Sequence, residues 1–371
     1  MKLFEIPLPE GDVQGIDIGY RGDNRTKLNP EDWLSRGFDG VRLIGKGIGK
    51  THLIAEEGYH NSTLFVGPHN GVVSLESCTL HVAKSKAWHQ GLALQEHYPK
   101  FMQRARDIEI VADGTNPDGG RRVWGLFPYQ ADQDLEDVTF HTADLAEHAS
   151  YCHGGFAKTG LRWNRVTVNG AGSQGCKVRF APNEGRWARG AKIVVTDSSF
   201  KGCGQTWGWR GGGGIVLEAG MSNVLVERCG FYGRPGEFRH LMIDDGAGAF
   251  RGFDSVGGVK PFANGIVIVN ACGFMGGPGS ESYSPIMRVG STAQTPTWPT
   301  AKAVLVQNSA VYGTRVLGQF GQIPTGKLKV AGCNTPQLKD IANAYGFDTR
   351  AEAQLVGPSG TFVPFSAGVA R

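Results

Sequence analysis

A pattern of eight or nine residues recurs along this chain and constrains the fold more than any other feature of the sequence. In each copy, β-branched residues alternate with others, then come a polar residue and Cys or Ser, with an apolar residue two places further on. A period of two is typical of a β-strand whose every second side chain points inward. The clearest copies are VVSLESCTL (72–80), IVVTDSSF (193–200), VLVERCGF (224–231), IVIVNACGF (266–274) and VLVQNSAV (304–311).

The small residue keeps its place in the pattern while the spacing between copies varies, which indicates a rigid segment joined by variable loops. A small side chain at the same inward bend of every copy predicts a ladder along an axis. This is the arrangement of a parallel β-helix, in which rungs stack about 4.8 Å apart. A β-sandwich is the alternative, but it does not explain the constant position. The small residues are Cys78, Ser198, Cys229, Cys272 and Ser309, and weaker copies stand at DIEIVADG, DLEDVTFHT and LRWNRVTVNG.

A second strand is expected after each later copy, and each ends at a glycine where the chain turns. The chain has 56 glycines, about twice the average share, and 19% charged residues. This composition favours an all-β solenoid with many tight turns over helical bundles or charged disorder. The second strands are IVLEAG (215–220), LMIDDG (241–246), PIMRVG (285–290) and VLGQFG (316–321), with earlier candidates at GLALQEH, VWGLFPY, SYCHGG and KVRFAP.

Charge and cysteine content exclude several classes of partner. The net charge of +4 is too small to indicate nucleic acid or an anionic membrane surface. No apolar run is long enough to span a membrane, and the start MKLFEIPLPEGD lacks the apolar segment of a signal peptide. We therefore expect the protein to fold where it is made. The seven cysteines include no CxxC pair and are expected to be reduced, mostly buried thiols.

The stretch LIGKGIGKT (43–51) invites comparison with a phosphate-binding loop, and it fails that comparison. The first glycine of such a loop would fall at Ile44, and Gly45 leaves the loop one residue short. A phosphate loop also opens a helix, whereas HLIAEEG is too short before Gly58 for a crossover helix. The stretch is better explained as a glycine-rich start of a repetitive β-fold.

The longer stretch GVRLIGKGIGKTHLI resembles the early coil of the pectate-lyase-like β-helices, in which an apolar strand runs into G-x-G-x-G-x-T and a second apolar strand. That superfamily includes polysaccharide lyases, glycoside hydrolases and many phage tailspikes. The resemblance covers roughly Gly40 to Gly332 and is one of architecture, without the signature of a subfamily. It implies a single-stranded right-handed parallel β-helix. Its tailspike-like members imply a homotrimeric virion protein that is assembled in the host cytoplasm beside other virion proteins.

The two ends of the chain fit short helical caps, which cover exposed rung edges. We expect an N-terminal segment with a capping helix over 1–40, a β-helix over 41–333 and a C-terminal cap over 334–371. Asn29 is a good N-cap and Pro30 suits the first helical position. TPQLKDIANAYGF predicts a short helix in the C-terminal cap, and FVPFSAG a final strand.

Candidate catalytic residues come from aligning the second strands on their terminal glycines. Two close carboxylates repel, so the pKa of one rises and that group can hold a proton near neutral pH. Such a pair serves glycoside hydrolysis, and an adjacent Arg can bind a sugar carboxylate or sulfate or assist β-elimination of a uronate. Outward charges that merely stabilise one another on a solvated sheet are the alternative. The alignment places Glu218, Asp244, Arg288 and Gln319 in one column.

Further candidates lie beside this column. Asp245 would add a substrate contact, or an oxygen ligand if calcium bound, although the sequence has no recognisable calcium loop. Trp207 and Trp209, in QTWGWRGGGG, would form a stacking platform for the apolar faces of sugars, as would the aromatic residues of VWGLFPY. Rings that only pack loops against the strands are the alternative. His141, His148 and His153 match no zinc spacing and are expected at turns and on the surface.

Two functions from different classes remain. The first is a tailspike-like protein that binds, and depolymerises by hydrolysis or elimination, a surface polysaccharide. The second is a non-enzymatic virion or receptor-binding component, because a fold of this kind does not determine function. A secreted lyase ranks third. A groove shared by Glu218, Asp244 and the tryptophans would favour the enzyme, and a flat face or subunit interface would favour the structural component.

Overall fold

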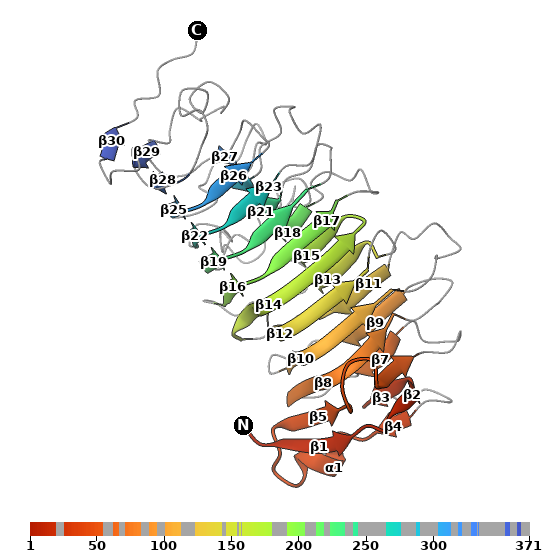
Figure 1. Ribbon diagram of the computed structural model, residues 1–371. Coiled ribbons are helices and arrows are strands. Elements are labelled where there is room, and N and C mark those ends of the chain that lie inside the picture. The colour runs from red at the N-terminus through yellow and green to blue at the C-terminus, as the bar shows by residue number, and fades with distance from the viewer. Residues whose placement is uncertain are drawn as a thin grey trace, which may run out of the picture.

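The protein consists almost entirely of parallel β-strands, arranged along one axis from β1 near the N-terminus to β28 (Figure 1). One short helix, α1 (Glu31–Leu34), accompanies them within the part of the chain that the structure describes. This computed structural model describes residues 1–19, 26–54, 62–66, 71–82, 89–94, 101–112, 123–142, 146–153, 156, 158–179, 191–204, 213–218, 223–233, 240–243, 265–275, 287–289, 303–312, 318–320, 328–331, 333, 353–356 and 362–364.

The strands form two sheets, in which every pairing is parallel except that of β29 with β30. Sheet one contains β1 (Leu3–Pro7), β2 (Gly11–Gln14), β5 (Gly40–Ile44), β6 (Thr51–Ile54), β8 (Gly71–His81), β10 (Phe101–Val111), β12 (Asp132–His141), β14 (Gly160–Ala171), β16 (Lys192–Thr196), β17 (Ser199–Cys203), β19 (Asn223–Glu227), β20 (Gly230–Tyr232), β22 (Ile266–Asn270), β23 (Gly273–Met275), β25 (Ala303–Gln307), β26 (Ala310–Tyr312), β28 (Leu328–Ala331), β29 (Ala353–Val356) and β30 (Phe362–Pro364). Sheet two contains β3 (Ile16–Ile18), β4 (Thr26–Leu28), β7 (Ser62–Val66), β9 (His89–Leu94), β11 (Val123–Phe127), β13 (His148–His153), β15 (Gln174–Arg179), β18 (Gly213–Glu218), β21 (Leu241–Ile243), β24 (Met287–Val289) and β27 (Gly318–Phe320). The predicted all-β class is confirmed.

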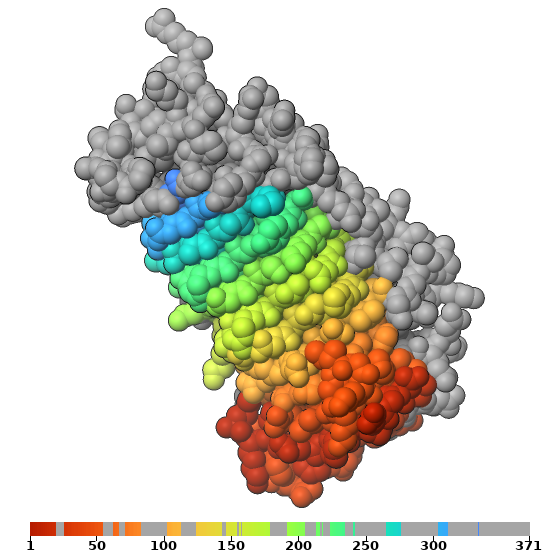
Figure 2. All heavy atoms as spheres, in the orientation of Figure 1, coloured from red at the N-terminus to blue at the C-terminus, as the bar shows by residue number. Residues whose placement is uncertain are grey.

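From β8 to β28 the chain alternates between the sheets, and we call a sheet-one segment with the sheet-two strand that follows it a rung. Each rung pairs with the rungs before and after it, so that Ile110 of β10 stands in register with Leu80 and Phe140. Successive rungs appear as parallel bands in chain order (Figure 2). The backbone hydrogen bonds therefore run along the axis, and equivalent residues of the repeat form columns.

The sheet-one segment of each rung bends at one residue in the left-handed backbone region. These residues have φ between 50° and 53°, a conformation that side chains other than Gly, Asn and Asp rarely adopt. At the later rungs the N–H of the bend residue donates to a carbonyl of the next rung, as Arg228 does to Asn270 (3.0 Å). This bond helps to hold the bend. The bend residues are Ser77, Asp107, Asp137, Arg165, Asp197, Arg228, Ala271 and Asn308.

The recurrent Cys or Ser follows this bend directly, and it forms the predicted inward column. Ser198 Oγ accepts the N–H of Val166 in the preceding rung (3.1 Å) and donates to Thr196 O (2.7 Å). The Cys229 thiol donates to Val195 O (3.5 Å). A small polar side chain thus satisfies backbone groups beside the bend, which explains the residue type. The buried column contains Cys78, Ile108, Val138, Val166, Ser198, Cys229, Cys272 and Ser309.

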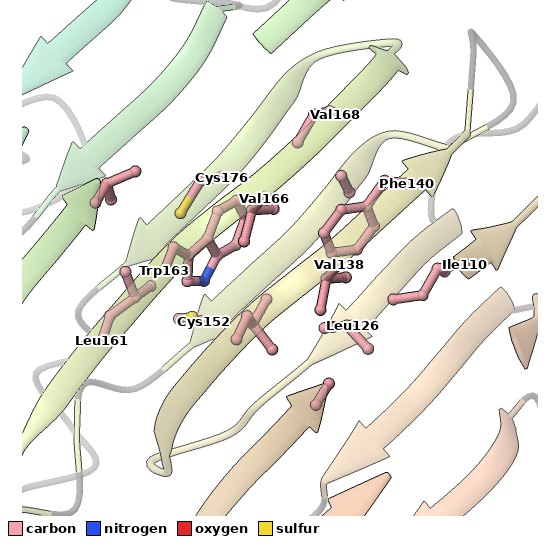
Figure 3. Packing of buried hydrophobic residues seen from close by; sticks show 14 of the residues in the cluster. Ile110, Leu126, Val138, Phe140, Cys152, Leu161, Trp163, Val166, Val168 and Cys176 are labelled. Carbon is pink, nitrogen blue, oxygen red and sulfur yellow. The ribbon is translucent and has the colours of Figure 1, made fainter. Parts of the chain in front are cut away.

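Stacked aromatic rings fill the core two residues after this column. Phe231 lies 5.1 Å from Phe200 and 4.9 Å from Phe274, with interplanar angles of 8°. Val168 occupies this column in β14, and there Trp163 places its ring between Phe140 (5.8 Å) and Phe200 (6.1 Å). Figure 3 shows Phe140 and Trp163 among aliphatic side chains of neighbouring strands. The stack is continuous because a tryptophan replaces the missing phenylalanine.

Glycines of sheet two make room for these rings. A Cβ at Gly214 would lie 2.7 Å from Cδ1 of Phe231, and one at Gly175 would lie 2.9 Å from Cδ1 of Phe200. Real Cβ atoms do not approach so closely in a core at normal packing density. The glycines of GGIVLE and QGCKVR are therefore required by packing as well as by turns.

A buried amide joins the two sheets inside the core. Gln133 Nε2 donates to Gln103 Oε1 (2.6 Å) in the preceding rung and to Ser150 Oγ (3.1 Å) of β13. Gln133 Oε1 accepts the indole N–H of Trp163 (2.7 Å). Because buried polar groups are costly when unpaired, this network fixes β12 against β13, the strand that carries part of the candidate site.

The strands before β8 show the structural role of LIGKGIGKT. The chain continues from Thr51 into strand β6 rather than a helix, so the exclusion of a phosphate loop is confirmed. Thr51 Oγ1 accepts the N–H of Lys46 (2.9 Å) and donates to Pro9 O (2.8 Å), which closes the glycine turn against the N-terminal segment.

A short helix, α1, lies where the sequence predicts the N-terminal capping helix, but it begins one residue later than expected, with Pro30 rather than Asn29 as its N-cap. Asn29 Oδ1 accepts the N–H of Glu31 (3.1 Å) at the start of α1, and Trp33 of α1 is buried. At the other end β29 extends sheet one beside β28, and β30 confirms the expected final strand. The helix predicted from TPQLKDIANAYGF lies outside the described residues.

Replacing Asp197 by Asn tests the charge ladder along the bend column. Arg228 donates to both oxygens of Asp197 (2.6 and 2.8 Å), and these bonds lower the pKa of Asp197 from its ordinary 3.8. A lowered folded-state pKa stabilises the protein above pH 3.8, and this contribution is lost as pH falls through the folded value. The pair is exposed and screened, so we expect Tm to fall by only about 1–2 °C at pH 7.

Asn tolerates the bend conformation, so this substitution changes the charge and little else. Thermal unfolding followed by circular dichroism at pH 7 and below pH 3.8 measures the effect. The difference between variant and wild type should shrink with acid and with added salt. A difference that is the same at all pH values would contradict this role of the pair.

Candidate functional site

The outer face of sheet two carries two columns of residues with binding chemistry. In one column Tyr129 stands in register with His153, and Arg179 and Glu218 follow on the next two rungs. The neighbouring column, two residues earlier in each strand, runs from Tyr151 through Lys177, Val216, Met242 and Arg288 to Gln319. Strands β13, β15 and β18 lie side by side and carry most of these positions (Figure 1). Adjacent members of a column are about 4.8 Å apart at the backbone.

Aromatic rings gather at the N-terminal end of these columns. Tyr129 and His153 stack at 5.3 Å with an interplanar angle of 20°. Phe127 lies 5.6 Å from Tyr151 and 6.1 Å from His153, and Tyr151 meets His153 edge-on at 5.3 Å. We call Phe127, Tyr129, Tyr151 and His153 the ring cluster. Tyr151 is buried, and the other three are half-buried.

A buried tryptophan and an acid support the ring cluster from the side. Trp124 stacks on Phe127 at 4.6 Å and meets Tyr151 edge-on at 5.2 Å. Its indole N–H donates to Glu147 Oε2 (3.1 Å), which fixes the ring plane. Because Trp124 is only 6% exposed, it orients the cluster rather than offering a surface of its own.

His148 stands in register with Trp124, and its ring lies 5.0 Å from the ring of Tyr151. Burial holds its pKa well below the ordinary value, and the positive charge of Lys177 lowers the pKa further. His148 is therefore neutral near pH 7. Its Nε2 lies 3.7 Å from Glu147 Oε1, a contact between a neutral imidazole and a carboxylate rather than an ion pair.

The arrangement suits recognition of a ring-shaped polar ligand. Aromatic faces stack on apolar C–H surfaces, while tyrosine hydroxyls and imidazole nitrogens hydrogen-bond to hydroxyl groups. Lys177 follows Tyr151 at the next rung and brings positive charge beside the ring cluster, and Arg179 stands in register with His153. Beyond them, Glu218 stands in register with Arg179 and is the only carboxylate among the described members of the two columns.

The strand register assumed for the predicted catalytic column holds in part and is shifted in part. Leu217 pairs with Ile243, as aligned, and Arg288 pairs with Gln319. Arg288, however, pairs with Met242, whereas the glycine alignment placed Arg288 in the column of Glu218. Because Ile243 pairs with Val289 rather than Met287, Arg288 and Gln319 are displaced by two residues, about 6.6 Å along the strand.

Several predicted site residues lie outside the described part of the chain: Asp244, Asp245, Trp207 and Trp209. The three histidines do not form one cluster. His141 belongs to β12 of sheet one, with its Nε2 3.7 Å from Glu109 Oε1, whereas His148 and His153 belong to β13 of sheet two. The expected surface position is wrong for His148, which is buried.

The outer face of sheet one is charged, and its charged side chains pair with one another. Asp134 of β12 accepts from Arg104 (3.3 Å) and Arg106 in the preceding rung and from Arg162 (3.0 Å) in the following rung. Glu136 and Asp137 both accept from Arg165, at 2.8 Å and 2.6 Å. These groups neutralise one another within the sheet, so we assign this face to stability rather than to a ligand.

Among the described residues, no three metal-ligating side chains lie close enough to hold an ion, and no helix is long and apolar enough to cross a membrane. Neither the family models nor the curated proteins nor the solved structures contain a match to this chain.

Proposed function

We propose that this protein binds a surface polysaccharide along the outer face of sheet two. The observation that carries the proposal is the half-buried ring cluster, which adjoins Lys177 and Arg179 on the next rung. Rings and cations at a spacing of about 4.8 Å match the alternation of apolar faces and polar or acidic groups along a glycan. A glycan lying along the axis would contact several rungs at once.

The finer fold belongs to the same proposal. We infer a single-stranded right-handed parallel β-helix of the pectate-lyase-like kind. Alternation of the chain between two parallel sheets and the bend column from Ser77 to Asn308 support it. Tailspike-like proteins of this architecture suggest a homotrimeric virion component that meets other virion proteins, assembled in the host cytoplasm.

Cleavage of the bound glycan is the second part of the proposal. Glu218, with Asp244 as the neighbouring acid expected from the register of Leu217 with Ile243, would supply the acid and base pair of a glycoside hydrolase. Arg179 pairs with Glu218 in register and is better placed than Arg288 to bind a sugar carboxylate near it. Such a pairing also suits β-elimination of a uronate.

A panel of bacterial capsular and acidic polysaccharides tests both parts. Affinity electrophoresis measures binding, reducing ends measure hydrolysis, and absorbance at about 235 nm measures elimination. We expect one or more glycans to retard the wild type. We also expect Glu218→Gln to lower cleavage by about 100-fold or more while retaining binding. Glu109→Gln is the matched control, because Glu109 lies on sheet one.

The outcomes separate the two functions. Binding with cleavage that fails in Glu218→Gln supports the enzyme. Binding without cleavage supports a receptor-binding module, and cleavage unaffected by the substitution removes Glu218 from the site. Absence of binding to every glycan by a folded protein would overturn the proposal in favour of a non-enzymatic virion component.

A further inference from the structure

Two histidines of sheet one meet near the N-terminal end, far from the ring cluster in sequence. His52 lies in β6 and His81 ends β8, and His52 stands in register with Thr79. Nδ1 of His52 is 3.2 Å from Nε2 of His81, and the ring centroids are 5.4 Å apart. Both side chains are half-buried, so solvent reaches the pair.

The hydrogen bond on the far side of His52 fixes its tautomer. Nε2 of His52 lies 3.2 Å from the carbonyl oxygen of Gly49, which can only accept, so Nε2 carries the proton. Nδ1 of neutral His52 therefore has a lone pair directed at His81. An imidazole that donates its outer N–H to a backbone carbonyl is held as metal ligands usually are.

The distance between the two nitrogens also suits a shared ion. Two nitrogens at about 2.0–2.1 Å from one tetrahedral ion are separated by about 3.3 Å. We propose that His52 and His81 together bind a divalent transition-metal ion such as Zn²⁺, with water completing the coordination. In the metal-free state His81 Nε2 donates to His52 Nδ1. On binding, the proton of His81 moves from Nε2 to Nδ1 by exchange with solvent, and Nδ1 of His52 and Nε2 of His81 both donate lone pairs to the ion.

The ion would join elements that are otherwise held by short pairings. β6 contributes only Thr51–Ile54, and its register with β8 covers His52 and Leu53. The turn before β6 is tied to β8 by the N–H of Gly49, which donates to Thr79 Oγ1 (3.0 Å). A metal bridge between His52 and His81 would therefore stabilise the first rung against opening.

Isothermal titration with ZnCl₂ tests this site on the intact chain, after accessible thiols have been alkylated. We expect one ion per chain and a loss of affinity of at least about tenfold in both His52→Gln and His81→Gln. His141→Gln is the matched control, since His141 lies two rungs further along the column of His81 and should leave binding unchanged. Circular dichroism shows whether each variant is folded.

Either of the following results would overturn the proposed metal site. Wild type that binds no Zn²⁺ at millimolar concentration would show that the pair is only a hydrogen bond. Binding that persists in both variants, or fails in one alone, would place the ion elsewhere. This test does not depend on any glycan, so its failure leaves the proposed function untouched.

Discussion

Phe231→Ala should lower the free energy of unfolding by about 3–5 kcal/mol, because it removes a fully buried ring from the middle of the stack. Phe200 and Phe274 contact this ring from both sides at 5.1 and 4.9 Å, and Gly214 leaves no side chain that could fill the space. Urea unfolding followed by circular dichroism measures the loss.

Tyr232→Ala is the matched control for this experiment. Tyr232 is the next residue of the same strand, points to the opposite face and is 43% exposed, so its removal should cost less than about 0.5 kcal/mol. Equal losses in the two variants would contradict an aromatic core that carries the stability of these rungs.

Tyr129→Ala should weaken binding of the polysaccharide by roughly ten- to thirtyfold, because an aromatic anchor commonly contributes about 2 kcal/mol to recognition. Tyr129 stacks on His153 and is half-buried, so the substitution removes a contact surface without opening the core. Affinity electrophoresis with the glycan that binds the wild type gives the change in dissociation constant.

The same control applies on the opposite sheet. Tyr232→Ala removes a tyrosine from sheet one and should leave glycan affinity unchanged. If Tyr129→Ala binds as well as wild type, or if Tyr232→Ala loses affinity instead, the site does not lie at the ring cluster.

Much of the fold could be predicted because successive strands of the parallel stack follow the same alternation of inward and outward residues. The alternation in IVVTDSSF and VLVERCGF predicts both strands and their inward faces, and the buried column at Ser198 and Cys229 agrees with it. The left-handed conformation of the bend residue was the missing part. A residue such as Arg228 in a left-handed conformation is unusual, and nothing in its chemistry indicates it before the stack is known.

Register was predictable only where the strand ends are equivalent. Leu217 and Ile243 each precede their terminal glycine by three residues in the sequence and pair with one another, so the alignment holds there. Val289 pairs with Ile243 although it directly precedes Gly290, so the glycine after β24 is offset by two residues. Because the loops between rungs vary in length, a terminal glycine indicates that the chain turns, but it does not show at which register position the strand ends.

The ring cluster could have been found from the same repeat. Phe127 and Tyr129 were recognised as possible stacking residues, but Tyr151, His153, Lys177 and Arg179 were not. Their signal is the alternation in SYCHGG and KVRFAP, whose outward positions carry aromatic and then basic residues. Assigning these residues to one cluster requires the register between the two strands. The short second strands contain no constant residue from which that register could be deduced.

Hydroxyl-radical footprinting of the protein with its bound polysaccharide tests the central claim most directly, since it reports which side chains the ligand covers. Oxidation of Phe127, Tyr129 and His153 should fall when the glycan is bound. Oxidation of Tyr232 and Met275, which are exposed on sheet one, should stay the same. Protection of Tyr232 and Met275 with no change at the ring cluster would contradict binding along the outer face of sheet two.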